Sequence, residues 1–194
     1  MARTIRGTTA GDTLRGTADR DFMFGARGKD TLYGFEGNDR LSGGEGGDRM
    51  VGGDGNDTYI AENTADRVIE LADEGTDLVL GALRRYKLTA NVENLTFITS
   101  RAHLGIGNTL DNVITGNEGR DQLFGGSGAD VLIGGAGNDS LFGEKGDDTL
   151  RGENGNDTLN GGAGADLLDG GRGADNMFGG KGNDIYIADN VLDT

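Results

Sequence analysis

A carboxylate recurs at every ninth residue in two long stretches of this chain, and this spacing is its most chemically informative feature. The two series are Asp12, Asp21, Asp30, Asp39, Asp48 and Asp57, then Asp121, Asp130, Asp139, Asp148, Asp157, Asp166, Asp175 and Asp184. Rows of carboxylates interleaved with glycine-rich backbone offer many oxygen ligands, which hard cations such as Ca²⁺ prefer. The residue types and their spacing therefore favour the binding of several cations.

The residues around each Asp repeat as well, in a pattern close to G-G-x-G-x-D-x-U-x, in which U is a large apolar residue. Glycine stands five positions before every Asp of both series. It also stands two positions before every Asp except the first two, where Ala10 and Asp19 replace it. Such a fixed internal period is typical of repeat architectures in which each unit buries its apolar side chain against its neighbours.

The nine-residue unit predicts a stack of short parallel strands. Side chains alternate across a strand, so U points inward while its neighbours point outward, and the glycine loop turns the chain. Two units would close one coil of 18 residues, and every second repeat would stack at a strand separation of roughly 4.8 Å. The expected inner columns are Leu123, Leu141, Leu159 and Met177 on one side and Leu132, Leu150, Leu168 and Tyr186 on the other.

The same stacking would bring the Asp residues of every second repeat together, for example Asp121 with Asp139. Two carboxylates 4–5 Å apart repel by about a few kcal/mol at intermediate dielectric, so the metal-free chain should stay open. A cation between the two carboxylates replaces this repulsion with attraction. Glycine allows positive φ and lets carbonyl oxygens face inward. An all-oxygen site of about six ligands favours Ca²⁺ over Mg²⁺, which demands stricter octahedral geometry.

The motif resembles the RTX, or haemolysin-type calcium-binding, nonapeptide repeat, most clearly in GGAGNDSL at 134–141 and GGAGADLL at 161–168. The resemblance implies a parallel β-roll, which is a right-handed β-solenoid, with Ca²⁺ between successive turns. It also implies export of the unfolded chain by a type I secretion system. The candidate calcium ligands are Asp30, Asp39, Asp48, Asp57, Asp121, Asp130, Asp139, Asp148, Asp157, Asp166, Asp175 and Asp184.

Asp12 and Asp21 are weaker candidates, because Thr8, Ala10, Thr17 and Asp19 replace glycines around them. If each pair of Asp residues 18 apart frames one ion, the first array offers up to four sites and the second up to six. Extracellular calcium modules typically bind at ~10⁻⁴–10⁻³ M, so the chain would fold outside the cell.

Three parts are expected: a first array at residues 1–61, a β-rich spacer or cap at 62–106, and a second array at 107–194. The spacer lacks the glycine lattice but keeps apolar groups at 68–71, 78–80 and 92–98, which we interpret as strands of longer coils or as a cap. A short helix at Ala65–Ala72 is an alternative. GNDTYIAEN at 55–63 returns as GNDIYIADN at 182–190. We therefore expect a fragment of a longer exoprotein, truncated at its C-terminal cap and poorly protected there.

The composition agrees with folding that depends on a cation. The 194 residues include 39 Gly, only 34% are apolar, and the net charge is −15. So little apolar surface cannot offset the entropy of ordering so much glycine without help from outside the chain. The absence of Cys excludes disulfides and thiolate metal sites. The acidic balance argues against nucleic acid as a partner, and no apolar run is long enough for a transmembrane helix.

No catalytic set is evident, so we expect a module without enzyme activity. His103 is the only histidine and has no metal-binding partner nearby in the sequence, which favours a structural or solvated role. Acid–base catalysis needs two carboxylates in different environments, whereas the repeated Asp residues share one. An EF-hand at Asp54–Asp57 fails because Tyr59 stands where that loop needs Gly. A disordered acidic linker does not explain the ninefold register.

The expected function is calcium binding coupled to folding, in a stabilising part of a secreted or surface-attached bacterial protein. The alternative is a carbohydrate-binding or adhesive module of a polysaccharide-active exoenzyme or an adhesin. Phe124, Phe142 and Phe178 would carry that contact, because they share the outward position three residues after Asp, in a column that Asn160 interrupts. Ile133 and Ile187 hold the same position on the opposite wall. The rings could instead pack against the spacer or a neighbouring module.

Overall fold

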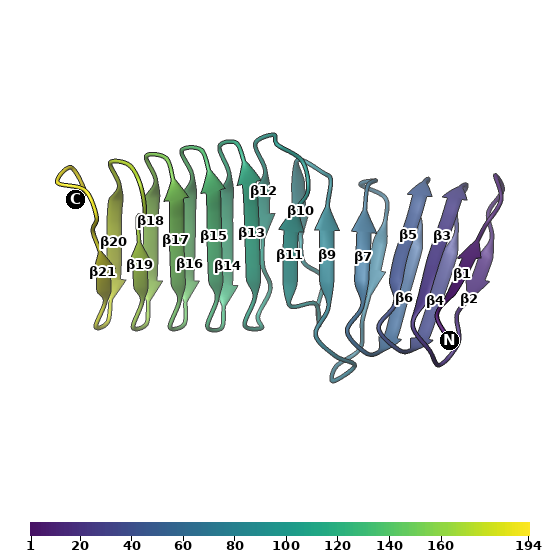
Figure 1. Cartoon of the computed structure of the whole chain (residues 1–194). Helices are drawn as coiled ribbons and strands as arrows, with labels where there is room; N and C mark the ends of the chain where they lie inside the picture. The colour runs from purple at the N-terminus through teal and green to yellow at the C-terminus, as the bar shows by residue number, and fades with distance from the viewer. The chain divides into compact units, whose positions relative to one another are not determined.

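A computed structural model describes all residues, 1–194, as an all-β parallel solenoid of about ten turns without any helix. The chain forms two compact units, one of residues 1–83 and 89–94 and the other of residues 84–88 and 95–194. Within each unit, successive strands alternate between two parallel sheets, and short turns at the strand ends connect them (Figure 1).

The first unit contains nine strands in two sheets, ordered β1-β3-β5-β7-β9 and β2-β4-β6-β8. Their bounds are β1 Arg3–Arg6, β2 Thr13–Arg15, β3 Asp21–Arg27, β4 Thr31–Glu36, β5 Arg40–Glu45, β6 Arg49–Asp54, β7 Thr58–Ala61, β8 Arg67–Ile69 and β9 Leu78–Gly81.

The second unit contains the remaining strands, ordered β10-β12-β14-β16-β18-β20 and β11-β13-β15-β17-β19-β21. Their bounds are β10 Arg85–Lys87, β11 Asn94–Phe97 (whose first residue belongs to the first unit), β12 Leu104–Ile106, β13 Val113–Glu118, β14 Gln122–Ser127, β15 Val131–Ala136, β16 Ser140–Lys145, β17 Thr149–Asn154, β18 Thr158–Ala163, β19 Leu167–Asp169, β20 Asn176–Lys181 and β21 Ile185–Ile187.

The stacking register is the predicted 18 residues, and it builds the two predicted inner columns. Leu123 pairs with Leu141, which pairs with Leu159, and the other column pairs Leu132 with Leu150 in the same way. All five of these leucines are fully buried. Full burial of such a side chain contributes roughly 1.5–3 kcal/mol, so the single apolar column of each wall supplies most of the core. Tyr186 differs from the rest of its column because it is 49% exposed.

The strands are longer than the three residues expected after each Asp. β15, for example, covers Val131–Ala136, so it includes Gly134 and Gly135. Its ladder with β17 continues through Gly135 and Ala136. The turn is therefore confined to the short segment that ends at Asp. The sequence pattern predicts that the whole glycine loop turns the chain, whereas the closely stacked backbones continue pairing over the first two glycines.

The segment between the arrays forms strands of irregular coils, as one of the two sequence interpretations predicted. The helical alternative at Ala65–Ala72 is wrong, because Arg67–Ile69 forms β8 and pairs with β6. The coil that follows Asp57 is two residues longer than a repeat coil, since Thr58 pairs with Leu78. The three-part division at residues 61 and 106 concerns repeat content and stays a prediction.

The outward positions of both units carry aromatic rings. Phe124 and Phe142 stack on β14 and β16 with their centroids 4.8 Å apart, and Phe178 is 55% exposed. In the first unit Tyr33 stacks on Phe35 with their ring centroids 6.2 Å apart.

The structure contains no helix that is long and apolar enough to cross a membrane.

Candidate metal centres in the turns

Each regularly spaced Asp lies in a turn, at or just before the first residue of a strand. Asp39 precedes β5 and Asp157 precedes β18, for example. Twelve of the fourteen are buried, with at most 2% of their surface exposed, and only Asp12 and Asp184 are less covered. The repeat therefore brings a row of carboxylates inside the molecule, at the edges of the apolar columns.

One oxygen of every regularly spaced Asp after Asp12 links two successive coils. Asp139 Oδ1 accepts the backbone N–H of Asp121 at 2.8 Å, and Asp157 Oδ1 accepts that of Asp139 at 2.7 Å. The same bond recurs along both walls of both units. The predicted proximity of Asp residues 18 apart is confirmed. Their contact is a carboxylate bonded to a backbone N–H, a charge-assisted hydrogen bond that favours the ionised form.

The other oxygen, Oδ2, divides the turns into two classes, which we call open and closed. In the open turns Oδ2 is buried and has no hydrogen-bond partner. The Asp residues with such an unpartnered oxygen are Asp30, Asp39, Asp48, Asp57, Asp130, Asp139, Asp148, Asp157, Asp166 and Asp175. A buried charged oxygen without a donor is costly unless a cation compensates it, so these ten oxygens point to missing positive charge.

In the closed turns the backbone N–H of the residue four positions earlier donates a hydrogen bond to the corresponding oxygen. Thr8 and Thr17 donate to Asp12 and Asp21 at 2.6 Å. Asn117 donates to Asp121 at 3.0 Å, and Asn108 donates to Oδ1 of Asn112 at 2.8 Å. These turns satisfy their own acceptors and leave no buried oxygen for an ion.

Backbone conformation separates the two classes. The residue four positions before Asp has positive φ in every open turn, whether it is glycine, as at Gly135 (110°), or not, as at Ala26 (83°) and Glu153 (73°). The turn of Asp184 shares this feature through Gly180 (100°). Thr8, Thr17, Asn108 and Asn117 do not have positive φ. The left-handed conformation thus coincides with the loss of the N–H donor to Oδ2.

In open and closed turns alike, the glycine five positions before Asp leaves room for Oδ2, a space we call the cradle, and in the open turns that oxygen is also unpartnered. A Cβ atom on Gly34 would lie 2.3 Å from Asp39 Oδ2 and 2.6 Å from the carbonyl oxygen of Gly52. A Cβ atom on Gly152 would lie 2.3 Å from Asp157 Oδ2 and 2.5 Å from the carbonyl oxygen of Gly170. A carboxylate and a carbonyl from the next coil therefore converge on one small space. An all-oxygen donor set of this kind fits a hard cation such as Ca²⁺.

The electrostatics of the open turns also favour a bound cation. No Lys or Arg forms an ion pair with any of the ten carboxylates. Burial raises the pKa of Asp39 to about 6, and it raises the pKa values of Asp139 and Asp148 to about 7, although the backbone hydrogen bond opposes the shift. Metal-free turns would therefore hold protons that a bound cation would displace.

The ladder includes carboxylates that the ninefold count missed. Asp66 and Asp193 stand 18 residues after Asp48 and Asp175, and each accepts the N–H of that earlier Asp. Extending the period of 18 beyond the glycine lattice would have found both. The Asp77 carboxylate accepts a hydrogen bond from the backbone N–H of Asp57, 20 residues earlier. The Glu93 carboxylate accepts one from the backbone N–H of Asp77. No regular spacing signals these last two, because the coil lengths change.

His103 occupies a ladder position, 18 residues before Asp121. Its backbone N–H donates to Asp121 Oδ1 at 2.7 Å, and its ring nitrogen Nδ1 lies 3.3 Å from the same oxygen. The ring stacks on Phe97 with centroids 4.2 Å apart, and Nε2 lies 2.9 Å from Thr99 Oγ1. Only 3% of the residue is exposed, and this burial lowers the pKa of the imidazole. The histidine is thus a structural element of a closed turn.

A family model described as the RTX calcium-binding nonapeptide repeat matches several overlapping stretches that together cover well over half of the chain. The matched residues are 6–34, 33–68, 106–141, 124–159, 133–168 and 151–186. A comparison with curated proteins found no match. The matches cover all ten open turns with an unpartnered oxygen, so the repeat pattern and the candidate metal centres coincide.

We predict that acid partly replaces calcium in stabilising the metal-free fold. The folded pKa values of Asp39, Asp139 and Asp148 lie above the ordinary value of 3.8. Their contribution is therefore fully present below about pH 3.8 and is lost as the pH rises through 6 to 7. Circular dichroism in calcium-depleted buffer should show β structure increasing from pH 8 to pH 5. Sedimentation should confirm that the protein stays monomeric. A β signal that falls on acidification would contradict the prediction.

We also predict that Gly152→Ala prevents calcium binding in one turn, that of Asp157. The new methyl group would occupy the cradle beside Asp157 Oδ2, and such overpacking typically costs about 1–3 kcal/mol. Calorimetry should show one calcium ion fewer than in the unchanged protein, and urea unfolding in saturating calcium should show the stability loss. Thr149→Ala, at an outward strand position with no cradle, is the control. An unchanged stoichiometry for Gly152→Ala would show that the cradle is not a cation position.

Proposed function

Because the chain belongs to the RTX calcium-binding nonapeptide repeat family, we propose that it is a β-roll module whose folding is coupled to calcium binding outside the cell. The single observation that carries this proposal is the set of ten buried carboxylate oxygens without a donor. Ca²⁺ supplies the missing charge when it is bound, and the residues of the open turns hold it through carboxylate and carbonyl oxygens.

The proposed ligands are the ten Asp residues of the open turns that have an unpartnered oxygen, together with Asp184. Asp184 shares the positive φ four residues earlier, at Gly180. Asp121 differs, because backbone N–H groups engage both of its oxygens. That Asp121 is a calcium ligand stays a prediction from the sequence. That Asp12 and Asp21 are weaker ligands also stays a prediction. The closed geometry of these last two turns supports this second prediction.

The charge distribution supports a switch between an open and a rolled chain. The net charge of −15 and the buried carboxylates oppose stacking when calcium is scarce. Calcium binds only the stacked state and so stabilises it by mass action. In the reducing, low-calcium interior of a bacterium the chain would stay unfolded and suited to export by a type I system. Outside, it would roll up as a stabilising part of a larger secreted or surface-attached protein.

The ladder carboxylates have a structural task in this proposal and no catalytic one. Each open turn gives its Asp the same hydrogen bond and the same cradle, whereas acid–base chemistry requires partners held in different states. The module would therefore contribute rigidity and spacing to the protein that contains it.

Calcium titration tests the proposed coupling. At pH 7.5 we expect little β signal in EGTA, a cooperative gain of β circular dichroism at submillimolar to millimolar calcium, and loss of that signal on renewed chelation. Magnesium at the same concentration is the control and should have little effect. Identical spectra in EGTA and in calcium would refute the proposal.

Paired asparagine variants extend this titration to single turns. Asp157→Asn should raise the calcium midpoint about threefold or more and remove one ion, because it neutralises an unpartnered oxygen. Asp121→Asn should leave the number of bound ions unchanged and shift the midpoint less, because backbone N–H groups already engage both Asp121 oxygens and the variant loses only one of those hydrogen bonds. Equal effects of the two variants would contradict the distinction between open and closed turns.

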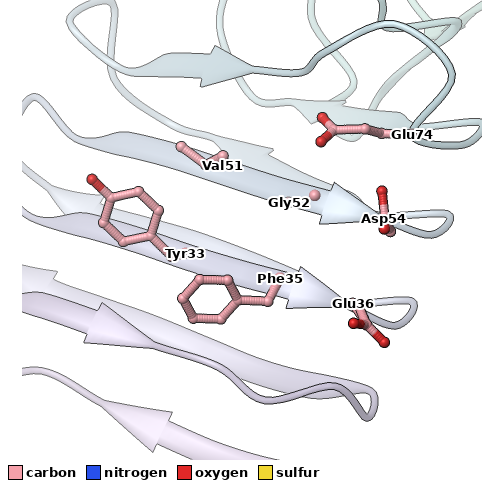
Figure 2. Close-up of a pocket in the computed structure, with 8 residues that line it drawn as sticks. Tyr33, Phe35, Glu36, Val51, Gly52, Asp54 and Glu74 are labelled. Atoms are coloured by element: carbon pink, nitrogen blue, oxygen red, sulfur yellow. The ribbon is translucent and has the colours of Figure 1, made fainter.

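A second candidate function, carbohydrate binding or adhesion, is favoured by the outward aromatic surfaces. Figure 2 shows a depression over β4 and β6 in which Tyr33 and Phe35 lie beside Val51, with Glu36 and Asp54 near the strand ends. Apolar rings bordered by carboxylates are suited to stack on a sugar and to bind its hydroxyl groups. The stacked pair Phe124 and Phe142 offers a similar surface in the second unit.

A glycan array probed at saturating calcium tests this second function. We expect binding to at least one polysaccharide class, lost or reduced about tenfold in Tyr33→Ala or Phe142→Ala while the calcium-induced β signal is kept. Absence of binding in the folded, calcium-loaded protein would remove this candidate and leave the structural role untouched.

A further inference from the structure

The turn between β8 and β9, which ends at Asp77, departs from the other turns of the first unit. The ladder of β6 with β8 ends at Val51 and Ile69, and Glu70 is the next residue, 18 positions after Gly52. Glu70 thus stands at a position that the repeat reserves for glycine. The next ladder carboxylate is Asp77, which accepts the N–H of Asp57 at 2.8 Å from 20 residues away. The longer coil therefore places an additional acidic side chain in this turn.

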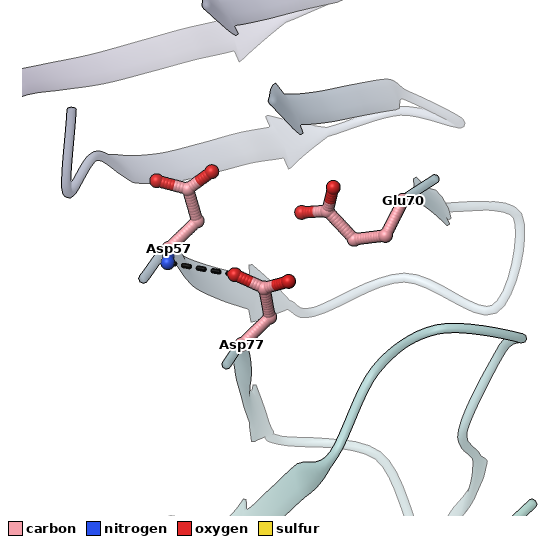
Figure 3. A group of neighbouring side chains, drawn as sticks. All are labelled: Asp57, Glu70 and Asp77. Atoms are coloured by element: carbon pink, nitrogen blue, oxygen red, sulfur yellow. Dashed lines mark hydrogen bonds between the residues drawn. The ribbon is translucent and has the colours of Figure 1, made fainter. Parts of the chain in front are cut away.

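The three carboxylates converge in the interior of the first unit. Ligand oxygens of Asp57, Glu70 and Asp77 all lie within 4.8 Å of one another. Figure 3 shows the three side chains pointing toward a common space. Only 1%, 5% and 1% of the three residues is exposed, and none of them forms an ion pair with Lys or Arg. Three like charges at this range repel strongly unless a cation lies among them.

Hydrogen bonds hold these carboxylates but leave inward oxygens free. Tyr59 donates its hydroxyl proton to Glu70 Oε1, while Glu70 Oε2 is buried and has no partner. Asp57 Oδ2 is likewise unpartnered. Asp77 is positioned by its bond from Asp57 and by its own N–H, which donates to Glu93 Oε2 at 2.8 Å. Each carboxylate thus accepts one hydrogen bond, which for Asp57 comes from the Asp39 N–H at 2.6 Å, and Asp57 and Glu70 each present a free oxygen to the same space.

We propose that Glu70 and Asp77, from the segment that lacks the nonapeptide repeat, join the open-turn residue Asp57 in a calcium site with three carboxylates. This proposal rests on the proposed calcium-dependent folding of the module. Oxygens within 4.8 Å of one another fit a single ion with Ca²⁺–O distances of about 2.3–2.6 Å. Ligand charge tunes calcium affinity, so three carboxylates should bind more tightly than an ordinary open turn. The site would order the first coil after the glycine lattice ends.

Tyr59 provides a spectroscopic probe of this site, because excited tyrosine sensitises the luminescence of a nearby Tb³⁺ ion. The chain has four tyrosines and no tryptophan. Tyr186 also lies near a turn carboxylate, since its hydroxyl oxygen and Asp184 Oδ2 both approach Gly179. All variants are therefore made in a Tyr186→Phe background. Tyrosine-excited Tb³⁺ emission should appear in this background, and calcium should displace it.

Glu70→Gln is the main test, with Glu62→Gln as the matched control because Glu62 is exposed. We expect Glu70→Gln to weaken Tb³⁺ binding at least tenfold and to lower the calcium stoichiometry by one. In calcium-free buffer the same variant should show more β structure than the control, because it removes one of three repelling charges. A merely structural role for Glu70 would not produce that increase.

Asp77→Asn is the second variant, and it keeps an oxygen acceptor for the Asp57 N–H. Circular dichroism at saturating calcium verifies that each variant folds. Should Glu70→Gln fail to fold, the same loss of one ion and of Tb³⁺ emission in Asp77→Asn supports the site. Unchanged stoichiometry and emission in the folded variants would overturn it. A background protein whose β structure ignores calcium would instead contradict the proposed function, so the two failures are distinguishable.

Discussion

The structure depends on how negative charge is compensated inside a narrow solenoid. Each wall of a coil contributes one large apolar side chain, so the core is a pair of thin columns with buried carboxylates at both edges. One oxygen of each carboxylate is satisfied by the backbone of the neighbouring coil, and this bond aligns the stack. The other oxygen is unpartnered in ten turns. Apolar burial and backbone pairing favour the rolled chain, while this uncompensated charge opposes it, and a bound cation decides the balance.

Much of the fold follows from the period alone. A strict ninefold repeat with an inward apolar residue predicts parallel strands 18 residues apart, and the Leu123–Leu141–Leu159 column confirms it. The irregular coils were harder to predict, because their lengths are set by local turns that have no repeating signature. For the same reason the position of Asp77 and the inward direction of Glu70 could not be read from spacing. Asp66 and Asp193 were within reach of an 18-residue count.

The sequence pattern signalled the distinction between open and closed turns only in part, at Thr8 and Thr17, because the distinction depends on a single backbone angle. The motifs of Asp121 and Asp139 differ four residues before Asp, where Asn117 donates to Asp121 while Gly135, with positive φ, leaves Asp139 Oδ2 free. Glycine at this position is not required, because Ala26 and Glu153 also adopt positive φ. The closed turns gather at the start of each array, next to β1–β2 and β12–β14. We infer that these turns give each array a beginning that needs no metal.

The most direct test is a crystal structure of the calcium-loaded protein with a long-wavelength anomalous difference map. Calcium peaks are expected beside the Oδ2 atoms of the open turns, such as those of Asp39 and Asp157, and none in the turns of Asp12, Asp21, Asn112 and Asp121. A rolled chain in which the open turns contain no ion, or in which the closed turns contain as many ions as the open ones, would contradict this expectation.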